Sequence, residues 1–245
     1  TPIEGYAGKI LGNGYAINGL TAPLFGTTSA SIKGLHLTNV VLNSNNNAHY
    51  GALVCEAVTT DNKSVVIEHC SAQGTFVVEN PTYEPVAPTI TNTQYSNDAT
   101  KASEMAYGGL VGISRGTTIS NCVNNVAITV KQVVAEGNTQ VLLPYVGGVV
   151  GITYRAVLAD SSSVYTNLND CVNNAAILYE DNNCSTEKWQ IFPAVGGVAG
   201  GIYQGGAAKN PANVGQTYTN CTNYGAVTFK GIGGGLAQDT QGYSQ

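Results

Sequence analysis

Charged side chains are scarce in this chain of 245 residues. They make up 10% of it, and the formal net charge is −5. Only Arg115 and Arg155 are arginine, and the lysines are scattered along the chain. Proteins that bind nucleic acid cluster Lys and Arg to neutralise phosphates. We therefore expect no nucleic-acid partner.

Long apolar runs are also missing. No stretch approaches the roughly 18 apolar residues that mark a spanning helix, so we expect no membrane-spanning segment in this chain. No secretory leader is recognisable, and Thr1 already lies inside what reads as a motif. Such a start fits a removed leader and a fragment of a longer surface protein. Scarce charge together with 30 glycines and 14 tyrosines favours an extracellular or cell-surface β protein.

What the chain has instead is internal repetition. A Gly-Gly-apolar phrase stands at 108–112, 147–151 and 196–200. Each copy is followed by Asn/Asp-Cys-Val/Thr-Asn and then by Ala-Ile or Ala-Val. A unit that cannot bury its own apolar face has to stack on copies of itself. The repetition therefore predicts a solenoid.

Aligning the repeats places the apolar residues in rows. The first row is Leu24, Leu53, Leu110, Val149, Val198 and Leu236. The second row is Ile17, Ile32, Ile67, Ile119, Leu168 and Tyr218, and three residues after its members come Leu20, Leu35, Cys70, Cys122, Cys171 and Cys221. The third row is Val41, Phe76, Ile128, Ile177 and Val227.

The shortest steps between rows are 8 or 9 residues, which is one strand plus one turn. Three strands per circuit predict an all-β chain, wound as a three-sided parallel β-helix, with residues 1–245 as a single domain. Longer gaps are predicted to be corner loops at 78–107, 131–146, 153–164, 180–195 and 203–217. Insertions of this kind in solenoids often carry function.

The segment Gly-Asn-Gly-Tyr-Ala-Ile-Asn-Gly-Leu at 12–20, followed by Pro-Leu-Phe-Gly at 23–26, carries a family resemblance. It resembles the first coil of the GLUG-motif-like right-handed β-helices of secreted and surface proteins of bacteria. Those proteins repeat G-G-L-V-G, then I-x-N-C/S, then G-x-I/V. The resemblance covers nearly the whole chain outside the loops and implies a right-handed β-helix with an adhesin-like role. The long insertions and the Cys in most coils depart from the family pattern.

Two rows are predicted to be structural ladders. Side chains projecting in parallel fit disulfide geometry poorly and do not converge on a tetrahedral metal. We therefore expect buried free thiols and no metal in the row Cys70, Cys122, Cys171 and Cys221. Cys55 is predicted to be a packing residue and Cys184 to be solvent-exposed. Amide side chains bond from one rung to the next, so we expect an asparagine ladder formed by Asn124, Asn173 and Asn223.

The loops are rich in aromatic residues, whose rings can stack on sugars or anchor protein interfaces. The row that contains His36 and His69 is interpreted as a polar edge, and His49 as part of a loop. The best candidates for contacting a glycan or protein partner are Arg115, Tyr154, Arg155, Trp189 and Tyr203.

Of three possible functions, the first is the one that we predict: the chain is not an enzyme but a non-catalytic binding or adhesin-like protein that contacts glycan or protein through its corner loops, with no cofactor. The second is a polysaccharide lyase or hydrolase. The aligned rows show no paired carboxylates of the kind that a hydrolase needs, so we assign no catalytic residue, although Asp160, Glu180 and Asp181 lie in loops. The third is a structural stalk or spacer.

Overall fold

The computed structural model describes residues 1–44, 49–61, 63–80, 104–132, 143–181, 194–203 and 215–231. Every regular element in these ranges is a β-strand, and none is a helix. Nearly all neighbouring strands pair in parallel. The predicted all-β class with parallel strands is therefore confirmed. The same ranges contain no helix that is long and apolar enough to cross a membrane.

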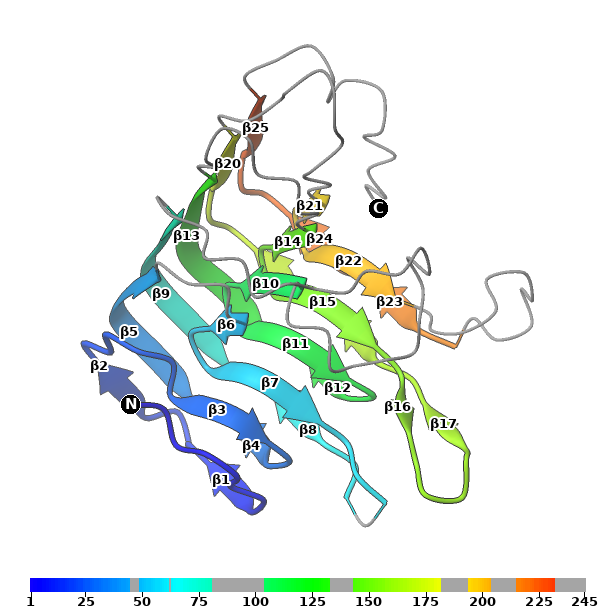
Figure 1. The fold of residues 1–245 in the computed structure, drawn as a ribbon. Helices are drawn as coiled ribbons and strands as arrows, with labels where there is room; N and C mark the ends of the chain where they lie inside the picture. Colours follow the sequence, from blue (N-terminus) through cyan, green and yellow to red (C-terminus); the bar gives the residue numbers. More distant parts are fainter. Residues whose placement is uncertain are drawn as a thin grey trace, which may run out of the picture.

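The strands form four parallel sheets, which we name after their strands in one circuit of the chain (Figure 1). The β10 sheet contains β6 (His49–Gly51), β10 (Glu104–Gly108), β14 (Leu143–Gly147) and β21 (Ala194–Gly196). The β11 sheet contains β3 (Phe25–Thr28), β7 (Val54–Val58), β11 (Val111–Arg115), β15 (Val150–Tyr154) and β22 (Ala199–Tyr203).

The other two sheets complete each circuit. The β12 sheet contains β1 (Lys9–Leu11), β4 (Ser31–Lys33), β8 (Val66–Glu68), β12 (Thr118–Ser120), β18 (Asn167–Asn169) and β23 (Thr217–Thr219). The β13 sheet contains β2 (Ala16–Asn18), β5 (His36–Ser44), β9 (Ser71–Asn80), β13 (Val123–Gln132), β19 (Val172–Asn173), β20 (Ile177–Asp181), β24 (Thr222–Asn223) and β25 (Val227–Gly231).

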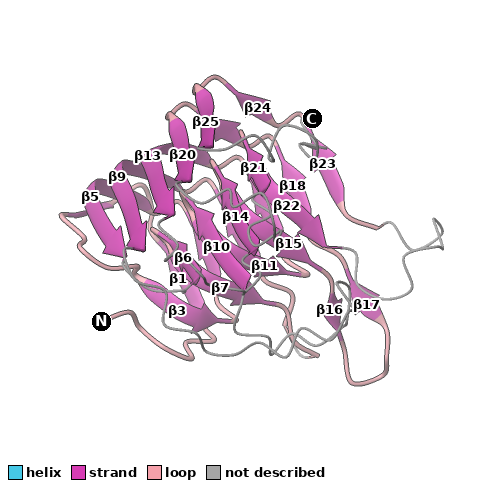
Figure 2. Cartoon of the chain, turned by 45° about the horizontal axis from the view of Figure 1, so that its top comes forward, coloured by secondary structure: helices cyan, strands magenta, loops and turns pink. Residues whose placement is uncertain are grey.

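The chain visits these sheets in a constant order, so each strand pairs with its equivalents in the circuits before and after it. Figure 2 shows these strands side by side in stacked sheets. Four sheets replace the three that the sequence predicted. The segments 104–108, 143–147 and 194–196 were expected to end loops, and they form the β10 sheet instead. The Gly-Gly phrase thus joins two strands, where one strand was predicted.

The Gly-Gly phrase is a corner because nothing larger fits there. A Cβ atom on Gly108 would collide with the carbonyl oxygen of Val111, and one on Gly109 with the side chain of Asn124. The β10 and β11 strands therefore meet at an angle with backbone packed on backbone. Glycine is the residue that allows such an approach.

The second apolar row holds from Ile32 onward but begins at a different residue. Ile10, rather than Ile17, pairs with Ile32, and Ile17 pairs with Leu37 in the β13 sheet. Leu20 is likewise outside the cysteine row, since its carbonyl accepts a hydrogen bond from the amide of Val41. The first circuit is thus displaced relative to the predicted alignment.

The third predicted row contains one wrong residue. Val41 pairs with Thr75 and is 47% exposed, whereas Leu42 is buried opposite Phe76. The cause is a register shift between Leu37 and Val40 in β5, around a residue with positive φ. Such a bulge turns every following side chain to the opposite face.

The turn between the β12 and β13 sheets has a constant length and a constant backbone conformation. Its residue just before the Leu or Cys row has a φ of 52° to 62° in five successive circuits, in Gly34, His69, Asn121, Asp170 and Asn220. Gly, Asn and Asp tolerate this left-handed region best. The polar character of the row therefore follows from the backbone.

The predicted loop at 153–164 contains a hairpin instead. Strands β16 (Ala156–Val157) and β17 (Ser163–Val164) pair antiparallel. Beyond β16, the amide of Ala159 donates a 2.6 Å hydrogen bond to the carboxylate of Asp61. The hairpin thus reaches across to the turn between β7 and β8.

The main core lies between the four sheets and includes large side chains from each of them, such as Tyr107, Phe25, Ile119 and Phe76. Three asparagines form a stack that ends at the exposed Asn223. Asn124 donates to the Oδ1 atom of Asn173 at 2.8 Å, and Asn173 donates to that of Asn223 at 2.7 Å. Asn124 and Asn173 are fully buried. These bonds satisfy polar groups that burial would otherwise penalise.

The asparagine stack gives a test of the fold. Asn173→Ala removes bonds to Asn124, Asn223 and the backbone of Ala175. Unpaired buried polar groups then remain, so we expect a loss of about 2–4 kcal/mol in the free energy of unfolding, measured by urea denaturation. The control is Asn174→Ala, since Asn174 is exposed and should cost about 0.5 kcal/mol or less. Equal losses for the two variants would contradict the buried stack.

Candidate functional site

A second apolar cluster lies on the other face of the β10 sheet. Along β10, Met105 and Tyr107 belong to the main core, whereas Ala106 points the opposite way, as alternation in a strand requires. This second cluster consists of Ala106, Ile113, Ile152 and Tyr154, with partly buried Tyr145 packed against it. Its residues come from β10, β11, β14 and β15, so the β10 and β11 sheets both contribute to this face.

Arg115 lies at the end of β11, where it is paired in register with Tyr154 on β15. Its Nε atom is 2.5 Å from the Oε1 atom of Glu56, and its guanidinium carbon lies 4.4 Å from the centre of the Tyr154 ring. The side chains of Arg115 and Glu56 are 15% and 21% exposed. A cation over an aromatic face is attracted by the negative ring face. The guanidinium is therefore held from two directions.

His49, at the start of β6, adds a titratable group to this face. Its partner in the sheet is Ala106, a member of the second cluster. Burial lowers the pKa of the His49 imidazole, Glu56 raises it and Arg115 lowers it, with burial the largest effect. The ring is therefore neutral at pH 7. Its Nδ1 atom is buried and has no hydrogen-bond partner among the described residues.

We call this group the Arg115 face: His49, Glu56 and Arg115 beside the second cluster. It combines one guanidinium, one carboxylate and one neutral imidazole over an aromatic and aliphatic base. Such a surface can bind a polar ligand that also presents an apolar side.

The structure brings together two of the five residues predicted to contact a partner. Arg115 and Tyr154 touch, but Tyr154 is only 6% exposed and so supports Arg115 from below. Arg155 points to the hairpin and donates to Ser163 at 3.3 Å. Tyr203 follows Tyr154 in register on β22, although its side chain lies outside the description. Trp189 lies outside the described residues.

The predicted loop carboxylates do not gather at this face. Asp160 is exposed in the hairpin turn, where hydrogen bonds from Ser162 lower its pKa. Glu180 pairs with Lys230 at 2.9 Å in the β13 sheet. The side chain of Asp181 lies outside the description.

Sequence reasoning missed His49 and Glu56. His49 was assigned to a loop because it follows a run of asparagines. A signal was present, since His-Tyr-Gly-Ala-Leu-Val at 49–54 matches Ala-Tyr-Gly-Gly-Leu-Val at 106–111. That match places His49 on a strand beside Ala106. Glu56 lies two residues after Val54, so the same match places it on the strand that pairs with β11.

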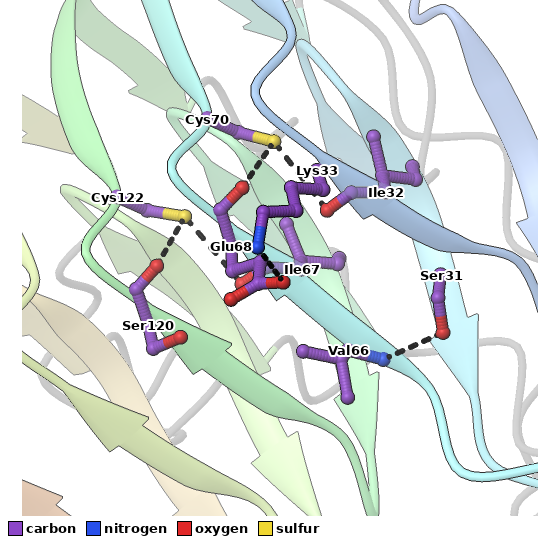
Figure 3. A network of polar contacts seen from close by, with 9 residues as sticks. All are labelled: Ser31, Ile32, Lys33, Val66, Ile67, Glu68, Cys70, Ser120 and Cys122. Atoms are coloured by element: carbon purple, nitrogen blue, oxygen red, sulfur yellow. Dashed lines mark hydrogen bonds and ion pairs between the residues drawn. The ribbon is translucent and has the colours of Figure 1, made fainter. Parts of the chain in front are cut away.

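The cysteine row lies at the turns between the β12 and β13 sheets, where Figure 3 shows two of its members. Cys70 and Cys122 point the same way from successive circuits, and both are fully buried, as is Cys171, while Cys221 is half-buried. The Cys122 thiol donates to the carbonyl of Ser120 at 3.2 Å. The neighbouring Cys171 and Cys70 thiols, together with burial, raise the Cys122 pKa. The Cys122 thiol is therefore neutral.

No group of three or more His, Cys, Asp or Glu side chains within the described ranges is arranged to hold a metal ion. Cys55 is half-buried, and burial is the main cause that raises its pKa to about 12. Cys184 lies outside the description.

A contact between a serine and a histidine occurs on the β13 sheet. The Nδ1 atom of His36 lies 2.8 Å from the Oγ atom of Ser71, on the adjacent strand. The ion pair Lys33–Glu68, at 2.9 Å, lies in the neighbouring β12 sheet (Figure 3). A serine within hydrogen-bond reach of an imidazole is the minimal arrangement of an activated nucleophile.

Comparison with solved structures adds a structural neighbour. No family model matches the chain, and no curated protein does. A solved structure described as a "putative immunoglobulin A1 protease" from Bacteroides ovatus is similar, with 14% sequence identity and a TM-score of 0.52. The match covers 89% of this chain and 51% of the other, so this chain spans about half the length of that neighbour.

The neighbour corrects one expectation. That neighbour is described as a protease, which contradicts the prediction that this chain is not an enzyme. The lack of paired carboxylates argued against a glycoside hydrolase and did not bear on other catalytic chemistry. At 14% identity the likeness itself establishes the fold alone.

The Arg115 face predicts a specific titration. We expect the pKa of His49, followed by imidazole NMR signals, to lie below 6.5. Glu56→Gln should lower it further and Arg115→Gln should raise it, because these charges act in opposite directions. A His49 pKa that is unchanged by both substitutions would contradict this arrangement of Glu56 and Arg115 around His49.

The same group affects stability. The unfolded state, with a His pKa of about 6.5, binds a proton more readily than the folded state. The free energy of unfolding should therefore fall as the pH is lowered through that value. The variant His49→Gln should lack the part of this decrease that is due to His49.

Proposed function

We propose that this chain is a right-handed parallel β-helix module, of the GLUG-motif-like kind, in an extracellular or cell-surface protein, and that it binds a glycan at the Arg115 face. The constant order of four parallel sheets and the left-handed residue before each Leu or Cys rung support the winding. The scarcity of charge supports the location.

One observation carries the binding role. Arg115 is paired to Glu56 and lies over the Tyr154 ring, yet its side chain is still 15% exposed to solvent. Taking this ion pair largely out of water has little value for the fold alone, because the desolvation of both charges offsets much of their attraction. Partly buried Tyr145 packs against the same second cluster that contains Tyr154 and offers an aromatic surface of the kind that sugars contact.

The proposal is tested with the 245-residue chain on a glycan array and by calorimetry on the best ligand. Arg115→Ala should weaken binding at least tenfold, whereas Arg155→Ala, on the hairpin, should leave it within twofold. Urea midpoints establish that both variants fold. Absence of binding to any glycan, or equal losses for the two variants, would refute the proposal. Binding to a deglycosylated protein in place of glycans would reassign the face to a protein partner.

The structural neighbour favours a second candidate, peptide-bond hydrolysis. The residues to test first are Ser71 as nucleophile and His36 as base, given their 2.8 Å contact. The chain is incubated with immunoglobulin A1 and with a control protein, and products are followed by mass spectrometry. Cleavage lost in both Ser71→Ala and His36→Gln would establish this candidate. Cleavage that persists in both would exclude the pair, and no cleavage of either protein would exclude the activity for this chain.

A further inference from the structure

We infer that the Arg115 face recognises a carboxylate, and that its ligand is an acidic glycan containing uronate or sialate sugars. This inference rests on the proposed glycan-binding function and adds the chemical class of the ligand. It concerns the hydrogen-bonding capacity that Arg115 retains in the folded protein.

Only some of the hydrogen-bond donors of the Arg115 guanidinium have a partner in the protein. Its Nε atom bonds to Glu56, while its two terminal nitrogens have no hydrogen-bond partner among the described residues. A guanidinium carries five N–H donors in a planar fork, and the terminal pair matches the two oxygens of a carboxylate. Arg115 therefore retains the donors that carboxylate recognition requires.

The fork is also held in place before any ligand arrives. The Tyr154 ring lies under the guanidinium, 4.4 Å away, and that ring is fixed among Ala106, Ile113 and Ile152. A rigid group loses little conformational entropy on binding. Arg115 thus resembles a preorganised receptor group more than a mobile surface arginine.

Glu56 orients the Arg115 guanidinium and restricts the ligands that it can bind. Its Oε1 atom takes the Nε donor, and its Oε2 atom lies 3.4 Å from the Thr27 hydroxyl. One carboxylate next to one guanidinium leaves the pair close to neutral, so a bare anion gains little long-range attraction. A ligand needs further contacts beside its carboxylate, which favours a larger molecule over a simple ion.

The surroundings of the fork suit a sugar. Tyr145 is partly buried, and its ring lies over Gly201, where a Cβ atom would collide with the ring. His49, in register with Ala106, adds a neutral imidazole to the same face. A uronate or sialate sugar combines a carboxylate, an apolar ring face and hydroxyl groups. An acidic peptide offers the carboxylate without the ring and is therefore the less favoured ligand.

The experiment compares ligands that differ only in the carboxylate. Trigalacturonate and its methyl ester are titrated into the 245-residue chain by calorimetry, with sialyllactose and lactose as a second pair. We expect each acid to bind at least tenfold more tightly than its neutral counterpart, with an advantage that shrinks as salt is added. A glutamate tripeptide is the third arm.

The variants are Arg115→Lys and, as the matched control, Arg155→Lys. Lysine keeps the charge and loses the planar fork, so Arg115→Lys should abolish the preference for the acid over the ester. Arg155→Lys should retain the preference. Urea midpoints within the error of the original protein show that both variants fold.

The outcomes separate the two proposals. Equal binding of acid and ester, or a preference that survives Arg115→Lys, overturns the carboxylate inference and leaves glycan binding standing. If the chain binds the glutamate tripeptide but neither acidic sugar, the carboxylate that it recognises belongs to a peptide and the glycan is ruled out as its source. Failure of every sugar to bind overturns the proposed function itself.

Discussion

The structure depends on backbone hydrogen bonding between equivalent strands of successive circuits. Each strand is short, from two to ten residues, and is stabilised by the strands on either side of it. Parallel pairing holds equivalent residues at the strand spacing of about 4.8 Å. Every row of like side chains, apolar, thiol or amide, follows from this one constraint. The core is consequently a set of stacks, and a residue in it is best understood together with the residues directly before and after it in its row.

Much of this arrangement could be predicted from the sequence, because rows of like residues leave a periodic signal. The rows of Leu53, Ile67 and Phe76 continue in the structure as aligned. The prediction failed where the backbone departs from regularity. The bulge before Val40 moves Val41 to the surface, and a bulge of this kind leaves no mark in the apolar pattern. The fourth sheet was missed because the strand ending at Gly108 and the strand beginning at Val111 are separated by only two residues.

The candidate site was less predictable for a physical reason. Glu56, Arg115 and Tyr154 are far apart in the sequence, at intervals that differ because the loops between them differ in length. Their contact arises from the register between β7, β11 and β15. Sequence reasoning chose Arg115 and Tyr154 as surface residues of aromatic and basic character. It could not show that the Tyr154 ring is buried in the second cluster, or that Glu56 supplies the opposite charge, since both facts depend on contacts between circuits and not on any motif.

The placement of Glu56, Arg115 and Tyr154 on three consecutive circuits has an evolutionary consequence. The circuit that carries Arg115 contributes one strand to each of the four sheets, so it is a complete structural unit. Removing the circuit that carries Arg115 would bring β7 next to β15, and the apolar stacks would close without a gap. The fold would survive, while the guanidinium would vanish and Glu56 would face Ile152. Loss of one circuit would therefore change the charged groups on this face with no point mutation at all.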